Sequence, residues 1–448
     1  MVAALEAGII ILVSIALIQG FLRVGQEATA IFFILSAVAL IIVHLTSFYF
    51  RWQMTPAYLV AAILLLVLIF GAQTGSIIKF ASISIAVLLL PLSFALSIGF
   101  PVKTLPTPEG PHAVGVAELN RGYTPGNHIE GNSSEKRQLH LKIWYPATFD
   151  NQKKYARDTL WSDFHNSERF SRVERFFTAY LKNIETHSFK AAPIASDRAE
   201  RSVLIYNHAL LSTASDNTLL MEFLASHGYL IVSIRHEDQR YEYASLQENL
   251  SKEEQARDLE NFKRLGADID RKARATLSLQ TYQASKTLPV IVRRRALDTE
   301  YVIDNLNSIL NTIPGCMNRT CVNEHKLGLV GLSLGGAVAT EFCKRDQRCQ
   351  AAVNLDGGIF GTNIQAPVTI PYLMLYSELN EGGNDFLKEA SGQTYEEHTI
   401  KGAMHLDFHD ATFTLPALRW FRLLGQIGGE EMTHQKNELV LKFLNDNL

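Results

Sequence analysis

Residues 327–336 read Leu-Gly-Leu-Val-Gly-Leu-Ser-Leu-Gly-Gly, the pattern from which the fold can be predicted. Its apolar first part predicts a short buried strand, and the small residues after it predict a helix. Gly331 and Gly335 stand two positions on either side of Ser333. A sharp turn from strand to helix strains the central serine, and only glycines leave room for it. The stretch therefore predicts a nucleophile elbow, with the serine hydroxyl at the carboxyl end of the strand.

Strand and helix patterns alternate along the chain on both sides of this elbow. Apolar runs predict strands at 113–119, 140–144, 202–206, 229–235, 327–332, 351–355, 372–376 and 396–400. Helical periodicity is found near 217–227, 297–313, 335–344 and 439–447. Such alternation favours a mostly parallel sheet flanked by helices on both faces. Together with the elbow it predicts the α/β-hydrolase fold.

A serine hydroxyl is a poor nucleophile until a base takes its proton. In this fold the catalytic residues follow the order serine, acid, histidine along the chain. His405 lies in Gly-Ala-Met-His, just past the last expected strand, and is the predicted base. His409 is one helical turn further on and is the alternative.

Two acids compete for the third position of this set. Asp356 ends the strand expected at 351–355, and Glu378 ends the next strand. Both positions can reach a histidine from the carboxyl edge of a parallel sheet, where the acid would orient the imidazole. The residues alone leave this choice open.

An oxyanion hole needs two backbone N–H donors. Leu334, directly after the nucleophile, is the first predicted donor. Leu210, in the loop Asn-His-Ala-Leu after the strand 202–206, is the second. The histidines and aspartates around His405 match no metal-ligand spacing, so neither a metal nor a cofactor is expected.

The first hundred residues have a different composition from the rest of the 448-residue chain. Apolar runs cover roughly 7–22, 28–50, 57–75 and 77–102. Each is close to the roughly 20 residues that cross a bilayer as a helix. We therefore expect an all-α bundle of four transmembrane helices over residues 1–102, in which His44 lies at the membrane interface.

The proline-containing segment 103–112 is expected to be a linker, and the hydrolase domain to span 113–448. Two stretches interrupt the alternation of strands and helices inside that domain. The aromatic and basic stretch 161–189 and the charged stretch 245–284 are both interpreted as helical insertions.

Charge and cysteine usage restrict the possible partners and the compartment. The net charge is −3 and no basic stripe is present, which argues against nucleic-acid binding. The four cysteines form two close pairs, Cys316 with Cys321 and Cys343 with Cys349. Close pairs on loops favour disulfides, which persist in oxidising compartments. The chain is therefore expected to be a multi-pass membrane protein with its hydrolase domain on the extracytoplasmic side.

The soluble part resembles the plasma-type platelet-activating-factor acetylhydrolases, which are α/β-hydrolase phospholipases of the A2 type. The resemblance spans roughly 113–414 and is strongest in five segments: 203–210, 224–229, 234–238, the elbow around Ser333, and 402–410. In 402–410, His405, Phe408 and Asp410 match the family pattern Gly-x-x-His-x-x-Phe-x-Asp. The first hundred residues lie outside the resemblance.

The resemblance implies specific roles for several residues. The family's acid lies in a Leu-Asp pair after the strand that follows the elbow, which favours Asp356 over Glu378. Its oxyanion donors correspond to Leu210 and Leu334, and no metal is implied. Ala209 departs from the family by replacing a glycine in the oxyanion loop, where a methyl group is expected to tilt the donor or narrow the pocket.

These features predict a serine hydrolase that cleaves carboxylic esters through an acyl-serine intermediate. The resemblance implies short-chain or oxidised phospholipid esters as substrates, and a membrane-embedded chain would hold the pocket near lipid. Two alternatives keep the chemistry: a general esterase or lipase, and an acyltransferase. A third is an inactive hydrolase fold that serves as a membrane-tethered interaction module.

Overall fold

The computed structural model describes residues 2–21, 27–70, 76–125, 136–149, 154–165, 171–196, 201–236, 246–265, 269–316, 321–323 and 325–448. Glu237 and Asp238, from one of the five segments of the family resemblance, lie outside these residues. The chain forms two compact units. The first consists of Met1–Thr104, Phe170–Ile184 and Thr414–Phe421, and the second of Leu105–Arg169, Glu185–Phe413 and Arg422–Leu448.

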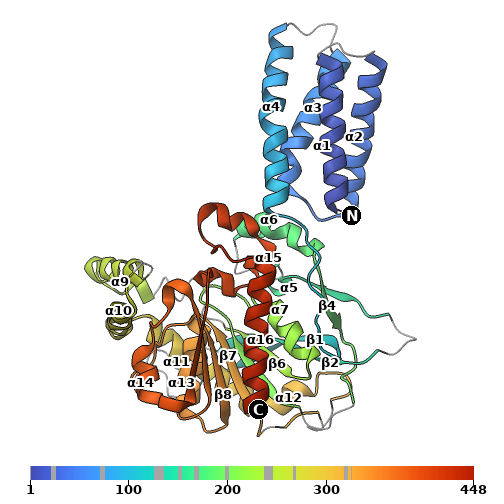
Figure 1. Cartoon of the computed structure of the whole chain (residues 1–448). Coiled ribbons are helices and arrows are strands. Elements are labelled where there is room, and N and C mark those ends of the chain that lie inside the picture. Colours follow the sequence, from blue (N-terminus) through green and yellow to red (C-terminus); the bar gives the residue numbers. More distant parts are fainter. Residues whose placement is uncertain are drawn as a thin grey trace. The chain divides into compact units, whose positions relative to one another are not determined.

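The second unit is built on one ten-stranded sheet with the order β10-β9-β8-β7-β5-β6-β2-β1-β4-β3 (Figure 1). The strands are β1 (Ala113–Tyr123), β2 (Arg137–Ala147), β3 (Arg157–Thr159), β4 (Glu185–Lys190), β5 (Val203–Asn207), β6 (Leu230–Arg235), β7 (Leu327–Leu332), β8 (Cys349–Leu355), β9 (Tyr372–Ser377) and β10 (Tyr395–Ile400). From β10 to β6 every neighbouring pair is parallel, whereas β2 pairs antiparallel with both β6 and β1. Helices lie on both faces of this mostly parallel sheet, and the predicted fold class is confirmed.

Each face of the sheet carries its own apolar core. The helices of this unit are α5 (Ser162–His165), α7 (Thr218–Ser226), α9 (Lys252–Leu265), α10 (Arg271–Ala284), α11 (Leu288–Asp304), α12 (Leu306–Leu310), α13 (Leu334–Arg345), α14 (Asp385–Ser391), α15 (Ala411–Thr414, whose last residue falls in the first unit) and α16 (Gly429–Asn447). Helices α7 and α16 pack on one face, and α11 and α13 on the other. The strands at the centre are buried on both sides, which explains their continuous apolar sequences.

Parallel strands place their carboxyl ends at one edge of the sheet. Four strands of this sheet lead there into segments that carry candidate site residues. Strand β5 ends at Asn207, β7 leads into Ser333, β8 into Asp356, and β10 into the segment that carries His405. Because β5, β7 and β8 are adjacent in the sheet, residues far apart in sequence become neighbours at this edge.

The first unit contains four long apolar helices: α1 (Val2–Phe21), α2 (Glu27–Ser47), α3 (Thr55–Phe70) and α4 (Ser76–Gly99). Each belongs to a stretch long and apolar enough to cross a membrane. The helix α6 (Arg172–Thr178), the turn η2 (Ala179–Asn183) and the turn η6 (Pro416–Phe421) belong to the same unit. The first unit extends to Thr104 and also contains segments from later in the chain. The boundary expected at residue 102, between the membrane region and the linker, therefore stays a prediction.

The first unit contains a buried cluster of polar side chains that was not predicted from the sequence. The Arg51 guanidinium donates to both carboxylate oxygens of Glu6, at 2.6 and 3.1 Å. His44, expected at the interface, is buried with its Nε2 3.4 Å from Glu6 Oε1, and its Nδ1 lies 2.6 Å from the Tyr58 hydroxyl. The pairing explains how a carboxylate and a guanidinium are accommodated in apolar surroundings.

The insertions agree only in part with the sequence. The stretch 245–284 contains helices α9 and α10, as predicted. In the described part of the stretch 161–189, which the sequence predicts to be a helical insertion, short helical segments are followed by strand β4. Burial alternates along β4, with Thr186 and Ser188 buried, which is the period of a strand and not of a helix. Disulfides join Cys316 to Cys321 and Cys343 to Cys349.

Candidate active site

Ser333 occupies a strained turn between β7 and α13. Its backbone has φ 54° and ψ −117°, outside the ordinary regions for a residue with a Cβ. A Cβ on Gly331 would lie 2.0 Å from the Gly335 carbonyl oxygen, and one on Gly335 would lie 1.9 Å from the Asn207 carbonyl oxygen. The two glycines thus allow the elbow to close and to pack directly against the end of β5.

His405 and Asp356 complete a hydrogen-bonded chain with Ser333. His405 Nε2 lies 3.0 Å from Ser333 Oγ, and its Nδ1 lies 2.7 Å from Asp356 Oδ2. The His405 side chain is 50% exposed, whereas that of Asp356 is fully buried. This is the geometry in which an imidazole takes a proton from a serine while a carboxylate fixes its tautomer.

The carboxylate of Asp356 is held on both oxygens. Its Oδ1 accepts the backbone N–H of Ser377 at 2.6 Å, and its Oδ2 also accepts the Asn380 amide at 2.8 Å. Desolvation lowers the pKa of His405, but the hydrogen bond and charge of Asp356 raise it more, so the pKa lies above its ordinary value of 6.5. A base with a raised pKa is a stronger proton acceptor once it is neutral.

The alternative residues lie elsewhere. Glu378 is exposed and accepts the backbone N–H of Gly402 at 2.7 Å, without a contact to the His405 ring among the described residues. His409 is turned into the protein, where it packs edge-on against Trp161 at 5.0 Å and accepts the Ala411 N–H. Burial, assisted by the charge of Lys436, lowers the pKa of His409 to about 3. The structure therefore brings together Ser333, His405 and Asp356, and not the alternatives.

The predicted oxyanion donors lie at two adjoining backbone segments. Leu334 opens helix α13, where the first N–H groups of a helix have no partner within the helix. Leu210 lies in the loop after β5, and the close approach of Gly335 to Asn207 brings this loop to the elbow. Within the described part of the chain, neither the Leu210 nor the Leu334 N–H makes a hydrogen bond.

The loop that carries Leu210 is held by His208 and Arg295. His208 Nδ1 donates to the carbonyl oxygen of Ala209 at 2.6 Å, and its Nε2 accepts the backbone N–H of His236 at 3.3 Å. Since C=O and N–H point in opposite directions in a trans peptide, the carbonyl bond turns the Leu210 N–H away from His208. The buried Arg295 guanidinium donates to the His208 carbonyl oxygen at 2.6 Å.

A second buried hydrogen-bond network contacts Asn207, the last residue of β5. His236 lies between Asp298, 2.8 Å from its Nδ1, and the Asn207 side-chain oxygen, 2.9 Å from its Nε2. Asp298 also accepts two hydrogen bonds from Arg137, at 2.7 and 2.6 Å. Sequence reasoning missed Asn380, Arg295 and Asp298, because each lies on a segment without a motif and joins the site only through the fold.

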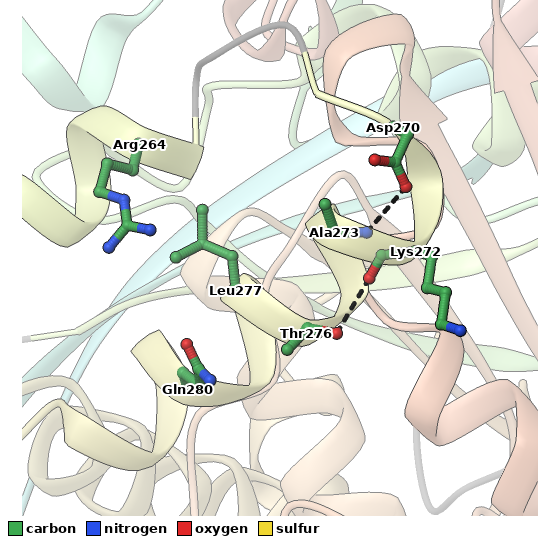
Figure 2. Close-up of a pocket in the computed structure, with 7 residues that line it drawn as sticks. All are labelled: Arg264, Asp270, Lys272, Ala273, Thr276, Leu277 and Gln280. Atoms are coloured by element: carbon green, nitrogen blue, oxygen red, sulfur yellow. Dashed lines mark hydrogen bonds between the residues drawn. The ribbon is translucent and has the colours of Figure 1, made fainter.

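Two cavities lie apart from these residues. A pocket of about 420 Å³ lies between α9 and α10. Figure 2 shows its lining residues: Arg264, Asp270, Lys272, Ala273, Thr276, Leu277 and Gln280. Asp270 caps its own helix there by accepting the Ala273 N–H at 3.0 Å. The other pocket, about 380 Å³, includes Val203 and Leu327, the first residues of β5 and β7. Neither cavity includes a triad residue.

One group of possible metal ligands is found in the described residues. Glu109, His434 and Glu438 bring three potential ligand atoms within 4.8 Å of one another. All three residues are exposed and none belongs to the triad.

Comparisons with known proteins agree with the fold and with the family resemblance. The family model for platelet-activating factor acetylhydrolase, isoform II, matches residues 97–448. Platelet-activating factor acetylhydrolase of Cavia porcellus is 23% identical over 367 residues, covering 78% of this chain and 79% of the relative. The Gallus gallus protein of the same name is 24% identical over 375 residues, covering 77% of this chain and 83% of the relative.

The fold is also similar to that of a solved esterase. Ferulic acid esterase from Streptomyces cinnamoneus aligns with a TM-score of 0.54 and 19% sequence identity, covering 78% of this chain and 94% of that chain. The predicted family resemblance is confirmed by these matches.

Proposed function

The chain belongs to the platelet-activating factor acetylhydrolase, isoform II, family, and from this membership we propose that it cleaves acyl esters of phospholipids that carry a short or oxidised acyl chain. It is a carboxylic ester hydrolase of the serine class on an α/β-hydrolase fold. The observation that carries the proposal is the hydrogen-bonded chain from Asp356 through His405 to Ser333.

In the proposed mechanism Ser333 Oγ attacks the ester carbonyl carbon while its proton passes to His405 Nε2. The tetrahedral intermediate collapses when the ester C–O bond breaks, and the leaving alkoxide takes the proton from Nε2. Water then attacks the acyl-serine, and its proton again passes through His405. Asp356 keeps Nδ1 protonated and stabilises the imidazolium that forms in each half of the reaction.

The N–H groups of Leu210 and Leu334 are proposed to bind the oxyanion. Both donors belong to the backbone, so their positions depend on the loop after β5 and on the start of α13. Donors that are fixed before the charge develops need no reorganisation during the reaction, which is the main source of their effect.

The substrate class is proposed from the relatives and from the apolar helices. Two relatives that cover most of this chain are named for hydrolysis of platelet-activating factor. The four apolar helices are proposed to span a membrane, which would hold the enzyme where lipid substrates are concentrated. The two disulfides support an extracytoplasmic position for the hydrolase domain, because such bonds persist in oxidising compartments.

A chain-length series of esters tests the proposal. Purified full-length protein in lipid nanodiscs is assayed on sn-2 acetyl, butyryl and long-chain phosphatidylcholines and on water-soluble p-nitrophenyl esters. We expect the sn-2 acetyl phospholipid to be cleaved fastest and Ser333→Ala to lose all turnover. Turnover confined to water-soluble esters would overturn the phospholipid assignment and favour a general esterase.

The acid and the reaction type are tested in the same preparation. Asp356→Asn is expected to lose most turnover, while Glu378→Gln is the matched control, because Glu378 bonds to Gly402 rather than to His405. Adding an alcohol or amine acceptor separates hydrolysis from acyl transfer by the product formed. A wild-type protein that cleaves no ester and transfers no acyl group would favour the inactive interaction module.

A further inference from the structure

The oxyanion loop contains a strained residue of its own. Leu211, directly after the proposed donor Leu210, has φ 58°. A left-handed backbone is unfavourable for a leucine and persists only where the surroundings hold it. Contacts beyond Leu210 and Leu211 themselves must therefore stabilise the conformation that presents the Leu210 N–H.

Asp216 makes contacts on both sides of the strained residue. Its Oδ2 accepts the backbone N–H of Ala209 at 3.1 Å, and its carboxylate also accepts the Ser212 hydroxyl. Its Oδ1 accepts the Tyr206 hydroxyl at 2.6 Å. One buried carboxylate thus bridges the residues immediately before and after the Leu210–Leu211 pair. Burial raises the pKa of Asp216 to about 6, so the group is a carboxylate above that pH.

The same residue also contacts the segment that carries the base. The carbonyl oxygen of Asp216 accepts the backbone N–H of Asp410 at 3.0 Å. Next to it, Lys436 Nζ donates to the Asn217 side-chain oxygen and, at 3.2 Å, to the carbonyl oxygen of Phe408. Phe408 and Asp410 belong to the stretch that begins at His405, so the oxyanion loop and the base are connected through residues 216 and 217.

We propose that Asp216 is a positioning residue for the oxyanion hole, holding the strained loop so that the Leu210 N–H faces the nucleophile. The inference rests on the proposed serine hydrolase function and adds a residue that touches neither substrate nor nucleophile. Its removal should weaken transition-state stabilisation rather than substrate binding, because the loop carries a donor for the oxyanion.

The test compares Asp216→Ala with Glu222→Ala in the full-length protein. Glu222 is also a buried carboxylate, on the helix α7 that begins at Thr218, but it accepts a hydrogen bond from the Ser188 hydroxyl on β4. Both variants therefore lose a buried acid from the same neighbourhood. The readouts are kcat and KM on an ester, the rate constant for fluorophosphonate labelling of Ser333, and the thermal midpoint.

We expect kcat and the labelling rate constant of Asp216→Ala to fall by about 10- to 100-fold, with KM changed by less than about twofold. Glu222→Ala should lower the thermal midpoint but change both rate constants by less than about twofold. Equal losses in the two variants, or a wild-type kcat in Asp216→Ala, would overturn the proposal.

Two further comparisons keep the result interpretable. If Asp216→Ala does not fold, Asp216→Asn retains a single acceptor oxygen and should show a smaller loss in the same direction; wild-type rates would overturn the proposal. If the wild type cleaves no ester, the proposed function fails. The fluorophosphonate labelling of Ser333 still decides the role of Asp216, because that reaction needs the nucleophile and oxyanion hole but no ester.

Discussion

Replacing Gly335 with alanine should separate the elbow from the oxyanion loop. The added Cβ would lie 1.9 Å from the carbonyl oxygen of Asn207 and 2.9 Å from that of His208. Both are backbone atoms of the segment that leads to Leu210, so no side-chain rotation relieves the contact. The two segments must move apart by about 1 Å, and a misplacement of that size costs on the order of 10²-fold in rate.

The same clash should also reduce stability. Overpacking a well-filled interior with one extra methyl group typically costs about 1–3 kcal/mol. We expect Gly335→Ala to fold with a lowered thermal midpoint and with kcat reduced about 100-fold. Gly428→Ala is the matched control, because a Cβ at that position meets no atom within 4 Å and Gly428 has φ −64°.

Steady-state kinetics on an ester, together with the rate of fluorophosphonate labelling, measures the loss. Normalising to the amount of folded protein, from near-ultraviolet circular dichroism, separates misplacement from unfolding. A Gly335→Ala protein with wild-type kcat per folded molecule would refute the argument that the elbow and the loop must touch. Equal losses in Gly335→Ala and Gly428→Ala would refute it as well.

Three further predictions concern the acid, the disulfides and the buried network. Asp356→Asn should lower kcat by about 10⁴-fold. Because Asp356 raises the pKa of His405, the kcat/KM of the wild type should rise with pH as His405 loses its proton at that raised pKa. In the variant this pKa is lower, so any residual activity should appear at a lower pH than in the wild type. Replacing both Cys343 and Cys349 with serine opens a loop with a sequence separation of 6 and should lower the free energy of unfolding by about 2 kcal/mol, measured by urea titration. Asp298→Asn should destabilise the protein by about 3–5 kcal/mol at neutral pH. Burial alone would raise the pKa of Asp298, but Arg137 and His236 hold it well below its usual range. The stability that the wild type gains from the ionised Asp298 should therefore be lost as the pH falls below about 4, so thermal unfolding should show the wild type and Asp298→Asn becoming more alike.

The residues around Ser333 allowed the fold to be predicted, because the elbow needs glycines at fixed positions and a strand before it. The order of serine, acid and histidine then limited the base to a few positions. The acid could not be chosen from the residues alone, since Asp356 and Glu378 both follow strands. The structure separates them through the conformation of each turn: Asp356 points to His405, and Glu378 to Gly402.

Contacts across long sequence distances account for what the sequence could not predict. Glu6 and Arg51 bury opposite charges against each other, yet each alone appears as an isolated charge at the edge of an apolar run. Asp216 follows a run of small residues and directly precedes the helix predicted near 217–227. Its contact with Ala209 depends on how the loop after β5 folds back, and no local pattern encodes that path.

The distribution of the site along the chain has a consequence for biosynthesis. A ribosome completes the oxyanion loop and the elbow at Ser333 long before it reaches His405. During that interval the nascent chain carries a nucleophile without its base, and strand β10, which leads to the base, has not joined the sheet. Parallel strands pair late in folding because they close long loops. Unfinished or prematurely terminated chains should therefore be hydrolytically silent, and ester cleavage should begin only after the segment that carries His405 has been made.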